Sequence, residues 1–169
     1  MNVSELMTTS VKSCSTNDDL QRAAQIMWEG DCGALPVLDA DNRVVGMITD
    51  RDICMAAYTQ SRPLWQIPVP SAMATRVYGV RETDPVEMVE TLMRRVRVRR
   101  LPVLDTHGRL KGILSMNDLA RHAHSSQGRK NNGLSGDSIV HTLAAIGEAQ
   151  VPAGRKDPAG SVNGTHFAA

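Results

Sequence analysis

A gapless internal repeat is the feature that most constrains what this chain can fold into. Residues 7–53 align with residues 73–119 at a constant offset of 66, and 13 of the 47 aligned positions are identical. Unrelated segments would match at only about one position in sixteen on ordinary residue usage. The repeat therefore predicts a fold made of two similar halves.

Each half carries the same order of local signals. Asp18 and Asp84 are interpreted as helix N-caps, because Gln21 and Glu87 follow three residues later and a helical apolar periodicity begins there. The apolar run Leu35–Leu38 and its second copy predict a buried strand, which a turn joins to another strand and a closing helix. Each repeat is therefore expected to be β-α-β-β-α.

The junction between the last strand and the last helix carries the candidate chemistry. A helix start presents unpaired backbone N–H groups and a partial positive charge, which suit an anion. At residues 46–53, Thr49 adds a hydroxyl, Arg51 a cationic fork and Asp52 a carboxylate able to accept from two neighbouring hydroxyls. This set suits a phosphate beside a ribose diol. The same Thr49-x-x-Asp52 pattern also fits a capping box, in which both side chains only close the helix start.

Composition excludes several classes of protein. A chain of 169 residues with net charge +1 suits one compact domain with accessory segments and argues against a chain-wide polyanion-binding surface. Residues 1–15 show no secretory signal, and no run is long enough to span a bilayer. We therefore expect a cytoplasmic protein without a membrane partner.

Cysteine and histidine spacing gives no sign of a metal or disulfide site. Cys14, Cys32 and Cys54 are widely spaced and are expected to be reduced, and His122 and His124 point to different faces of a helix. The sequence also shows no nucleophile elbow and no Walker loop, so we expect no enzyme activity.

The stretch from Arg94 to Arg100 holds five arginines in seven residues. A nucleic-acid contact is one interpretation, but no aromatic residue is interleaved for base stacking. Two of these arginines close a predicted helix, where cations are favoured. A solvated face or dimer rim is therefore preferred over nucleic acid.

The tandem repeat, with Leu-Pro-Val ahead of Gly-h-h-[Ser/Thr]-x-x-Asp in each copy, resembles the cystathionine-β-synthase (CBS) domain pair, or Bateman module, over roughly residues 1–123. Small stand-alone bacterial proteins of this family are most similar. The resemblance implies an α+β fold in which the repeats pack pseudo-symmetrically through their sheets. It also implies two clefts that bind adenosine-containing ligands (AMP, ADP, ATP or related adenosyl compounds), a homodimer, and an effector protein that it does not identify.

The expected organisation follows the repeat. Its parts are a first repeat with a lead-in helix (1–60), a linker (61–72), a second repeat (73–123), a polar linker (124–136), a C-terminal helix (137–149) and a disordered tail (150–169).

The resemblance also assigns roles by matching position. In each cleft the closing Asp would take the ribose hydroxyls, the Thr or Ser three residues earlier the phosphate, and the residue after the motif's Gly the adenine. The first cleft is expected to hold Met47, Thr49, Arg51, Asp52, Val77 and Arg100. The second is expected to hold Thr9, Val11, Ala34, Ile113, Ser115, Asn117 and Asp118.

The two expected clefts differ in charge. Asn117 stands where the first repeat has Arg51, and Ala34 stands where the second has Arg100. We therefore expect the Asp52 cleft to prefer phosphorylated adenosine, as a regulatory ligand rather than a cofactor. The other cleft is expected to be weaker, empty or filled by a ligand with an uncharged tail. The alternative function is a structural or interaction module without nucleotide, with a redox response through its cysteines.

Overall fold

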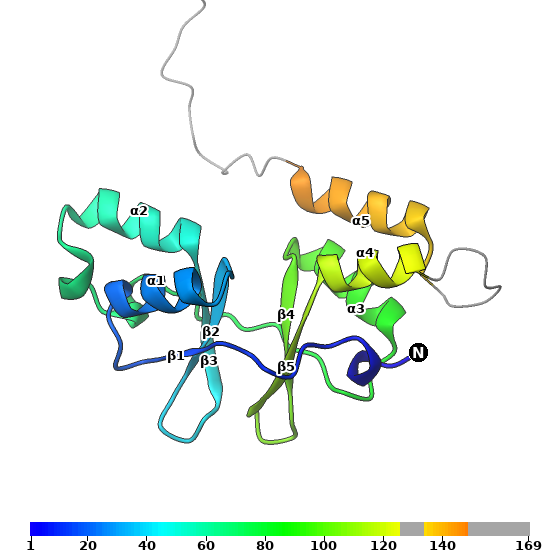
Figure 1. The fold of residues 1–169 in the computed structure, drawn as a ribbon, viewed down its shortest axis with the longest axis horizontal. Helices are drawn as coiled ribbons and strands as arrows, with labels where there is room; N and C mark the ends of the chain where they lie inside the picture. The colour runs from blue at the N-terminus through cyan, green and yellow to red at the C-terminus, as the bar shows by residue number, and fades with distance from the viewer. Residues whose placement is uncertain (126–133, 149–169) are drawn as a thin grey trace, which may run out of the picture.

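Two small β-sheets, each with its own helices, stand side by side in the computed structural model, which describes residues 1–125 and 134–148 (Figure 1). The first half comprises β1 (Cys14–Ser15), α1 (Leu20–Glu29), β2 (Ala34–Leu38), β3 (Val44–Thr49) and α2 (Asp50–Gln60). The second comprises α3 (Val86–Val96), β4 (Arg100–Leu104), β5 (Leu110–Ser115) and α4 (Met116–Ser125). The 3-10 turn η1 (Val3–Glu5) precedes the first half, η2 (Leu64–Gln66) and η3 (Val69–Ser71) lie between the halves, and α5 (Gly136–Gly147) follows the second. The expected α+β class is confirmed.

The sheets repeat the same pairing. In the first half β1 runs parallel to β2, and β2 runs antiparallel to β3. In the second half β4 and β5 form the same hairpin, but the first strand is reduced to one parallel bridge, Val80 with Val103. That bridge is the counterpart of the Cys14–Val37 pair at the offset of 66.

The hairpin ends meet at a pseudo-twofold axis. Arg43 forms an antiparallel bridge with its own repeat counterpart, Arg109, and the N–H of Val44 donates to the carbonyl of Gly108 at 3.0 Å. An element that pairs with its own copy must lie on the local symmetry axis. The predicted pseudo-symmetric packing through the sheets is therefore confirmed.

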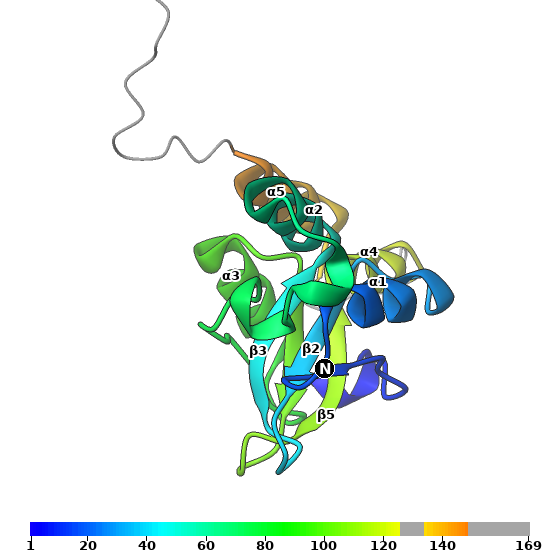
Figure 2. The same ribbon diagram turned by 90° about the vertical axis from the view of Figure 1, so that its left-hand side faces the viewer.

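Each sheet is completed by a segment from outside its own repeat. Thr8 pairs with Ile113 of β5 through two backbone bonds of 2.9 Å, and Ala74 pairs with Met47 of β3 at 2.9 and 3.0 Å. The cores follow the same exchange. Val3 is buried with the second repeat, while the linker residues Ile67 and Val69 are buried with the first. Figure 1 shows the N-terminal segment crossing from the second half to β1 of the first, and Figure 2 views the molecule along that direction, with the two sheets one behind the other.

Helix α1 begins one residue later than predicted, because Asp19 rather than Asp18 accepts the N–H of Arg22, at 2.8 Å. The carboxylate of Asp18 instead accepts the N–H of Ser15 at 2.7 Å and closes the preceding turn. Asp84 makes the equivalent bond to the residue three before it, also at 2.7 Å, and α3 likewise starts one residue late. The N-cap prediction was wrong in both copies for the same reason.

Helix α5 overlaps the stretch 137–149 where the sequence predicts a C-terminal helix, and begins one residue earlier. Ser135 caps it by accepting the N–H of Ser138 at 3.0 Å, and its own residues Ile139 and Thr142 are buried. It packs against α3 and α4 of the second repeat (Figure 1). The predicted tail, 150–169, and most of the predicted polar linker fall outside the described residues.

Among the helices in the described ranges, none combines the length and apolarity needed to cross a membrane.

Candidate functional site

A cleft of about 780 Å³ opens between the two halves beside the start of α2. The first repeat supplies the end of β3 and the first turn of α2, and the start of the second repeat supplies Ala74, Arg76 and Tyr78. The second repeat supplies the loop before β4, and α5 supplies its last turns. The lining residues are Gly33, Ala34, Met47, Thr49, Asp50, Arg51, Asp52, Ala74, Arg76, Tyr78, Arg97, Val98, Arg99, Arg100, Leu101, Pro102, Leu143, Ile146 and Gly147.

Positive charge dominates this cleft. Five arginines line it against two aspartates, Asp50 and Asp52. The arginines are Arg51, Arg76, Arg97, Arg99 and Arg100. Guanidinium groups bind phosphate and carboxylate groups through paired N–H donors, and several around one hollow attract anions more strongly than one alone. The cleft is therefore suited to a ligand with negative charge.

The capping interpretation of the motif is confirmed. Asp52 Oδ2 accepts the N–H of Thr49 at 2.9 Å and its hydroxyl at 2.7 Å, while the Thr49 oxygen accepts the Asp52 N–H at 3.2 Å. Within residues 1–125 and 134–148, no donor is recorded at Asp52 Oδ1. Capping thus uses one carboxylate oxygen and leaves the other available to the cleft.

The structure brings most of the first predicted set together. Met47, Thr49, Arg51, Asp52 and Arg100 all line the cleft. Two positions differ from expectation. Ala34, expected in the second cleft, lines this one, and Val77 does not line it although its neighbours Arg76 and Tyr78 do.

The second predicted set is not brought together in the same way. Thr9 and Val11 line a separate hollow of about 440 Å³ beside the hairpin ends, together with Asp105, Arg109 and Lys111. Four predicted residues line neither this hollow nor the main cleft: Ile113, Ser115, Asn117 and Asp118.

Asp118 is also more fully occupied than its counterpart. Its Oδ2 accepts the N–H and the hydroxyl of Ser115 at 2.8 and 2.6 Å, and its Oδ1 is paired with Arg121. The side chain is only 9% exposed. The carboxylate therefore has both oxygens engaged by the protein, whereas Asp52 has one.

The charge difference between the repeats is larger than the sequence analysis found. At the offset of 66, none of the five cleft arginines has a basic counterpart. The pairs are Arg51 with Asn117, Arg76 with Ser10, Arg97 with Asp31, Arg99 with Gly33, and Arg100 with Ala34. Sequence reasoning identified two of these pairs. The signal for two more lay in the Arg94–Arg100 run, whose interpretation as a solvated face or rim missed that Arg97 and Arg99 line the cleft beside the predicted Arg100.

Other lining residues were missed for different reasons. Tyr78 lines the cleft with an aromatic side chain and lies one residue from the predicted Val77. Leu143, Ile146 and Gly147 come from α5, outside the repeat, so no internal comparison pointed to them.

The cysteines give no chemical centre. Burial, and secondarily the charge of Asp18, raises the pKa of the Cys14 thiol to about 12, so that it stays protonated and unreactive near neutrality. Cys32 is partly buried and Cys54 is exposed, and both are free thiols. Across 1–125 and 134–148 there is no cluster of three or more His, Cys, Asp or Glu side chains that would hold a metal ion.

Comparison with known proteins gives a consistent result. The family model described as CBS domain matches residues 3–58 and 69–125. A CBS domain-containing protein, YhcV of Bacillus subtilis (strain 168), is 35% identical over 125 residues, which are 74% of this chain and 87% of that protein. Two solved structures are similar at 25% identity. The CBS domain pair of protein MJ0100 in complex with 5'-methylthioadenosine and S-adenosyl-L-methionine has a TM-score of 0.65, with 72% of this chain and 98% of that chain covered. CBSX2 in complex with AMP has a TM-score of 0.66, with 75% and 98% covered.

Proposed function

Because the chain belongs to the CBS-domain family, we propose that it is a regulatory module that senses an adenosine-containing ligand bound in the Asp52 cleft. We propose that the ligand carries phosphate, that the protein is not an enzyme, and that it acts in the cytoplasm. Occupancy would be passed to an effector protein through a change in the cleft walls, one of which is the end of α5.

One observation carries this proposal: five arginines share a hollow with a carboxylate that has one oxygen left over from capping. A volume of about 780 Å³ is within the usual range for small-molecule sites. In the proposed complex, the arginines and the α2 start bind phosphate, Asp52 Oδ1 accepts from the ribose hydroxyls, and Met47 and Tyr78 border the adenine.

Charge also discriminates between the ligands of the two structural relatives. S-adenosyl-L-methionine carries a sulfonium cation, which five arginines would repel, while the phosphate of AMP would be attracted. We therefore propose AMP, ADP or ATP over S-adenosyl-L-methionine or 5'-methylthioadenosine for the Asp52 cleft. The site around Asp118 is proposed to be weak or empty, because its carboxylate is engaged and its surroundings lack the arginines.

Isothermal titration of the full chain with AMP, ATP, 5'-methylthioadenosine and S-adenosyl-L-methionine tests the proposal. We expect one strong site per chain for the phosphorylated ligands, weakened at least tenfold in Asp52→Asn and in Arg100→Ala. Asp118→Asn is the matched control and should keep the wild-type isotherm. Absence of heat with every ligand, or equal effects of Asp52→Asn and Asp118→Asn, would refute it.

A further inference from the structure

Helix α5 is firmly anchored at one end and loosely held at the other. Its buried residues, Ile139 and Thr142, both precede residue 143, and Thr142 donates to Glu90 of α3 at 2.6 Å. The residues from 143 to 148 are exposed or half-buried, and several of them line the Asp52 cleft. Because a helix end with few buried contacts opens at a low cost in free energy, the cleft end of α5 is the part that moves most readily.

This loose end carries an acid where a helix favours a base. Glu148 is the C-cap of α5, and its N–H donates to the carbonyl of Ala144 at 3.1 Å. The partial negative charge at a helix C-terminus repels a carboxylate. The last turn, residues 144–147, has the sequence Ala-Ala-Ile-Gly and offers no basic side chain against this repulsion. The compensating charge comes from Arg97 of the cleft, whose Nη2 donates to Glu148 Oε2 at 3.2 Å.

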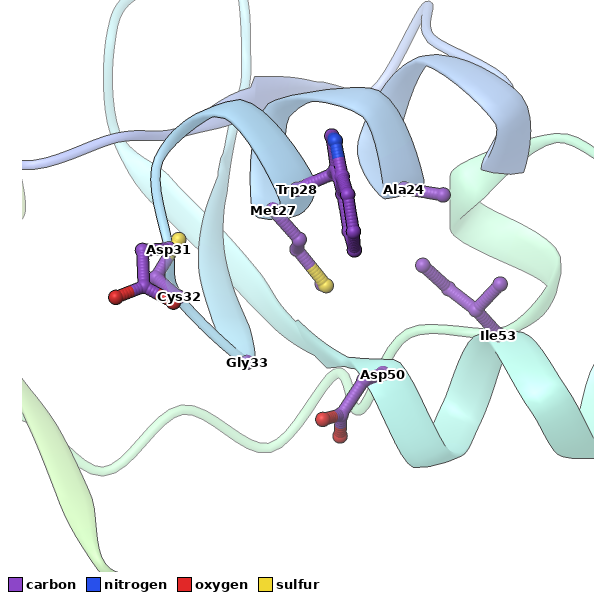
Figure 3. A pocket seen from close by; sticks show the side chains of 8 residues that line it. All are labelled: Ala24, Met27, Trp28, Asp31, Cys32, Gly33, Asp50 and Ile53. Atoms are coloured by element: carbon purple, nitrogen blue, oxygen red, sulfur yellow. The ribbon is translucent and has the colours of Figure 1, made fainter.

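The backbone gives no reason for an arginine at position 97. Arg97 ends α3 with φ at 55°, in the left-handed region that favours Gly, Asn and Asp. Its counterpart at the offset of 66 is Asp31, which has φ at 46°. Figure 3 shows the Asp31 carboxylate directed away from Met27 and Ile53, in the hollow between α1 and α2. The first half thus has a residue that suits the turn, whereas the second half has a less favourable one whose side chain reaches the cleft and α5.

We propose that Glu148 is a built-in competitor for the anion site of the Asp52 cleft. In the free protein its carboxylate neutralises Arg97, and a ligand phosphate that binds Arg97 displaces it. Glu148 then faces the negative end of α5 without a counter-ion, so the last turn of α5 leaves the cleft wall. This role rests on the proposed function, which supplies the phosphate. It assigns the moving part to α5, which lies outside the residues matched by the family model.

The competition favours ligands with more negative charge than a carboxylate. The side chains of Arg97 and Glu148 are 36% and 67% exposed, and water weakens an ion pair at such a site. A phosphate group carries up to two negative charges and three acceptor oxygens, so it displaces a single carboxylate. Because an exposed pair of this kind is weak, Glu148 should lower the affinity for a phosphate ligand by about two- to fivefold.

Isothermal titration with ATP and with inorganic tripolyphosphate, both without divalent cations, measures the competition. Glu148→Gln removes the charge and keeps the length of the side chain, so we expect both anions to bind about two- to fivefold more tightly. Asp137→Asn is the matched control, because it removes the same charge from the other end of α5, roughly 16 Å away, and should keep the wild-type Kd at about 0.1 M salt. Circular dichroism melts verify that each variant is folded.

Hydrogen–deuterium exchange detects the displacement itself. In the wild type, either anion should make the amides of residues 144–148 exchange faster, while residues 139–142, held by the bond from Thr142 to Glu90, keep their rates. In Glu148→Gln the same anions should change the last turn less, because no charged group is left without a partner. Closure of α5 over the ligand would instead slow the exchange of residues 144–148, and that result would overturn the proposal.

The affinities separate this proposal from the proposed function. Nucleotide binding that is equal in the wild type and Glu148→Gln refutes the competitor and leaves the nucleotide site standing. A gain of the same size in Asp137→Asn also refutes it, because the effect would then be one of overall charge. Tighter binding of tripolyphosphate to Glu148→Gln, with no nucleotide bound by either protein, refutes the proposed function and supports the competitor. A chain that binds neither anion refutes both.

Discussion

A buried hydrogen bond between α5 and α3 allows a quantitative prediction. Thr142 is completely buried, and its hydroxyl donates to Oε1 of the buried Glu90 at 2.6 Å. Thr142→Val preserves the shape of the side chain and removes the donor. A hydrogen bond to a charged group contributes about 1.5–3 kcal/mol, and a carboxylate that loses a donor in a buried site has no water to replace it. Because the Ser138 hydroxyl still donates to Glu90 at 3.2 Å, we expect a loss of about 2 kcal/mol.

That loss corresponds to a roughly 30-fold larger population with α5 detached. Hydrogen–deuterium exchange measured by mass spectrometry should show amides of residues 136–147 exchanging faster by that factor, while β2 and β3 keep their rates. Thr142→Ser keeps the hydroxyl and removes one methyl group, worth about 0.8 kcal/mol, so its effect should be near fourfold. If Thr142→Val exchanges within about twofold of the wild type, the bond does not hold α5 in place.

Four further outcomes are expected. Iodoacetamide at pH 8 should label Cys54 and leave Cys14 unlabelled in the native chain, since burial raises the pKa of Cys14 to about 12. The pKa of the Cys14 thiol is higher in the folded chain than its ordinary value of 9.0. Its contribution to the free energy of unfolding should therefore be intact below pH 9 and decline toward pH 12. The free energies of unfolding of the wild type and Cys14→Ala, measured by urea titration, should converge over that range. Gly46→Ala should lower the urea midpoint, because its new Cβ would lie 2.5 Å from Met73 Sδ; an unchanged midpoint would show that Met73 moves aside freely. Asp118→Ala should lower stability by about 1–2 kcal/mol in urea titrations through loss of its cap bonds, and a loss below about 0.3 kcal/mol would contradict the cap assignment.

The hairpins and the capping boxes could be predicted from sequence because their causes are local. Asp39 ends the longest identical block of the repeat, and its Oδ1 accepts the N–H groups of Asp41 and Arg43, both at 2.9 Å. Asp105 makes the same two bonds at 2.8 and 2.9 Å, and the bond from the Arg109 N–H is the main reason that the pKa of Asp105 is lowered. A side chain that accepts hydrogen bonds from the backbone of its own turn can be predicted from a few neighbouring residues.

The errors arose where more than one local partner was available or where the cause was distant. Asp18 lies within reach of both a turn and a helix start, and the pattern alone does not decide between them. Val77 was chosen by matching this chain to the first strand of the family's repeat, but in the second half that strand is reduced to the bridge at Val80. The wall built by α5 depends on contacts about fifty residues apart in the chain, which no periodicity records.

The exchange of segments between the halves affects the order in which the chain can fold during synthesis. Every residue of the first core, from Cys14 to Met73, has been made once Met73 has left the ribosome, whereas the second core joins Val3 to Leu119 and Ile139. The first eight residues must therefore wait until Ile113 has been made before all their backbone partners exist. A gene fragment ending after the first half would leave that leading stretch without its sheet, and one starting at the second half would lack it altogether.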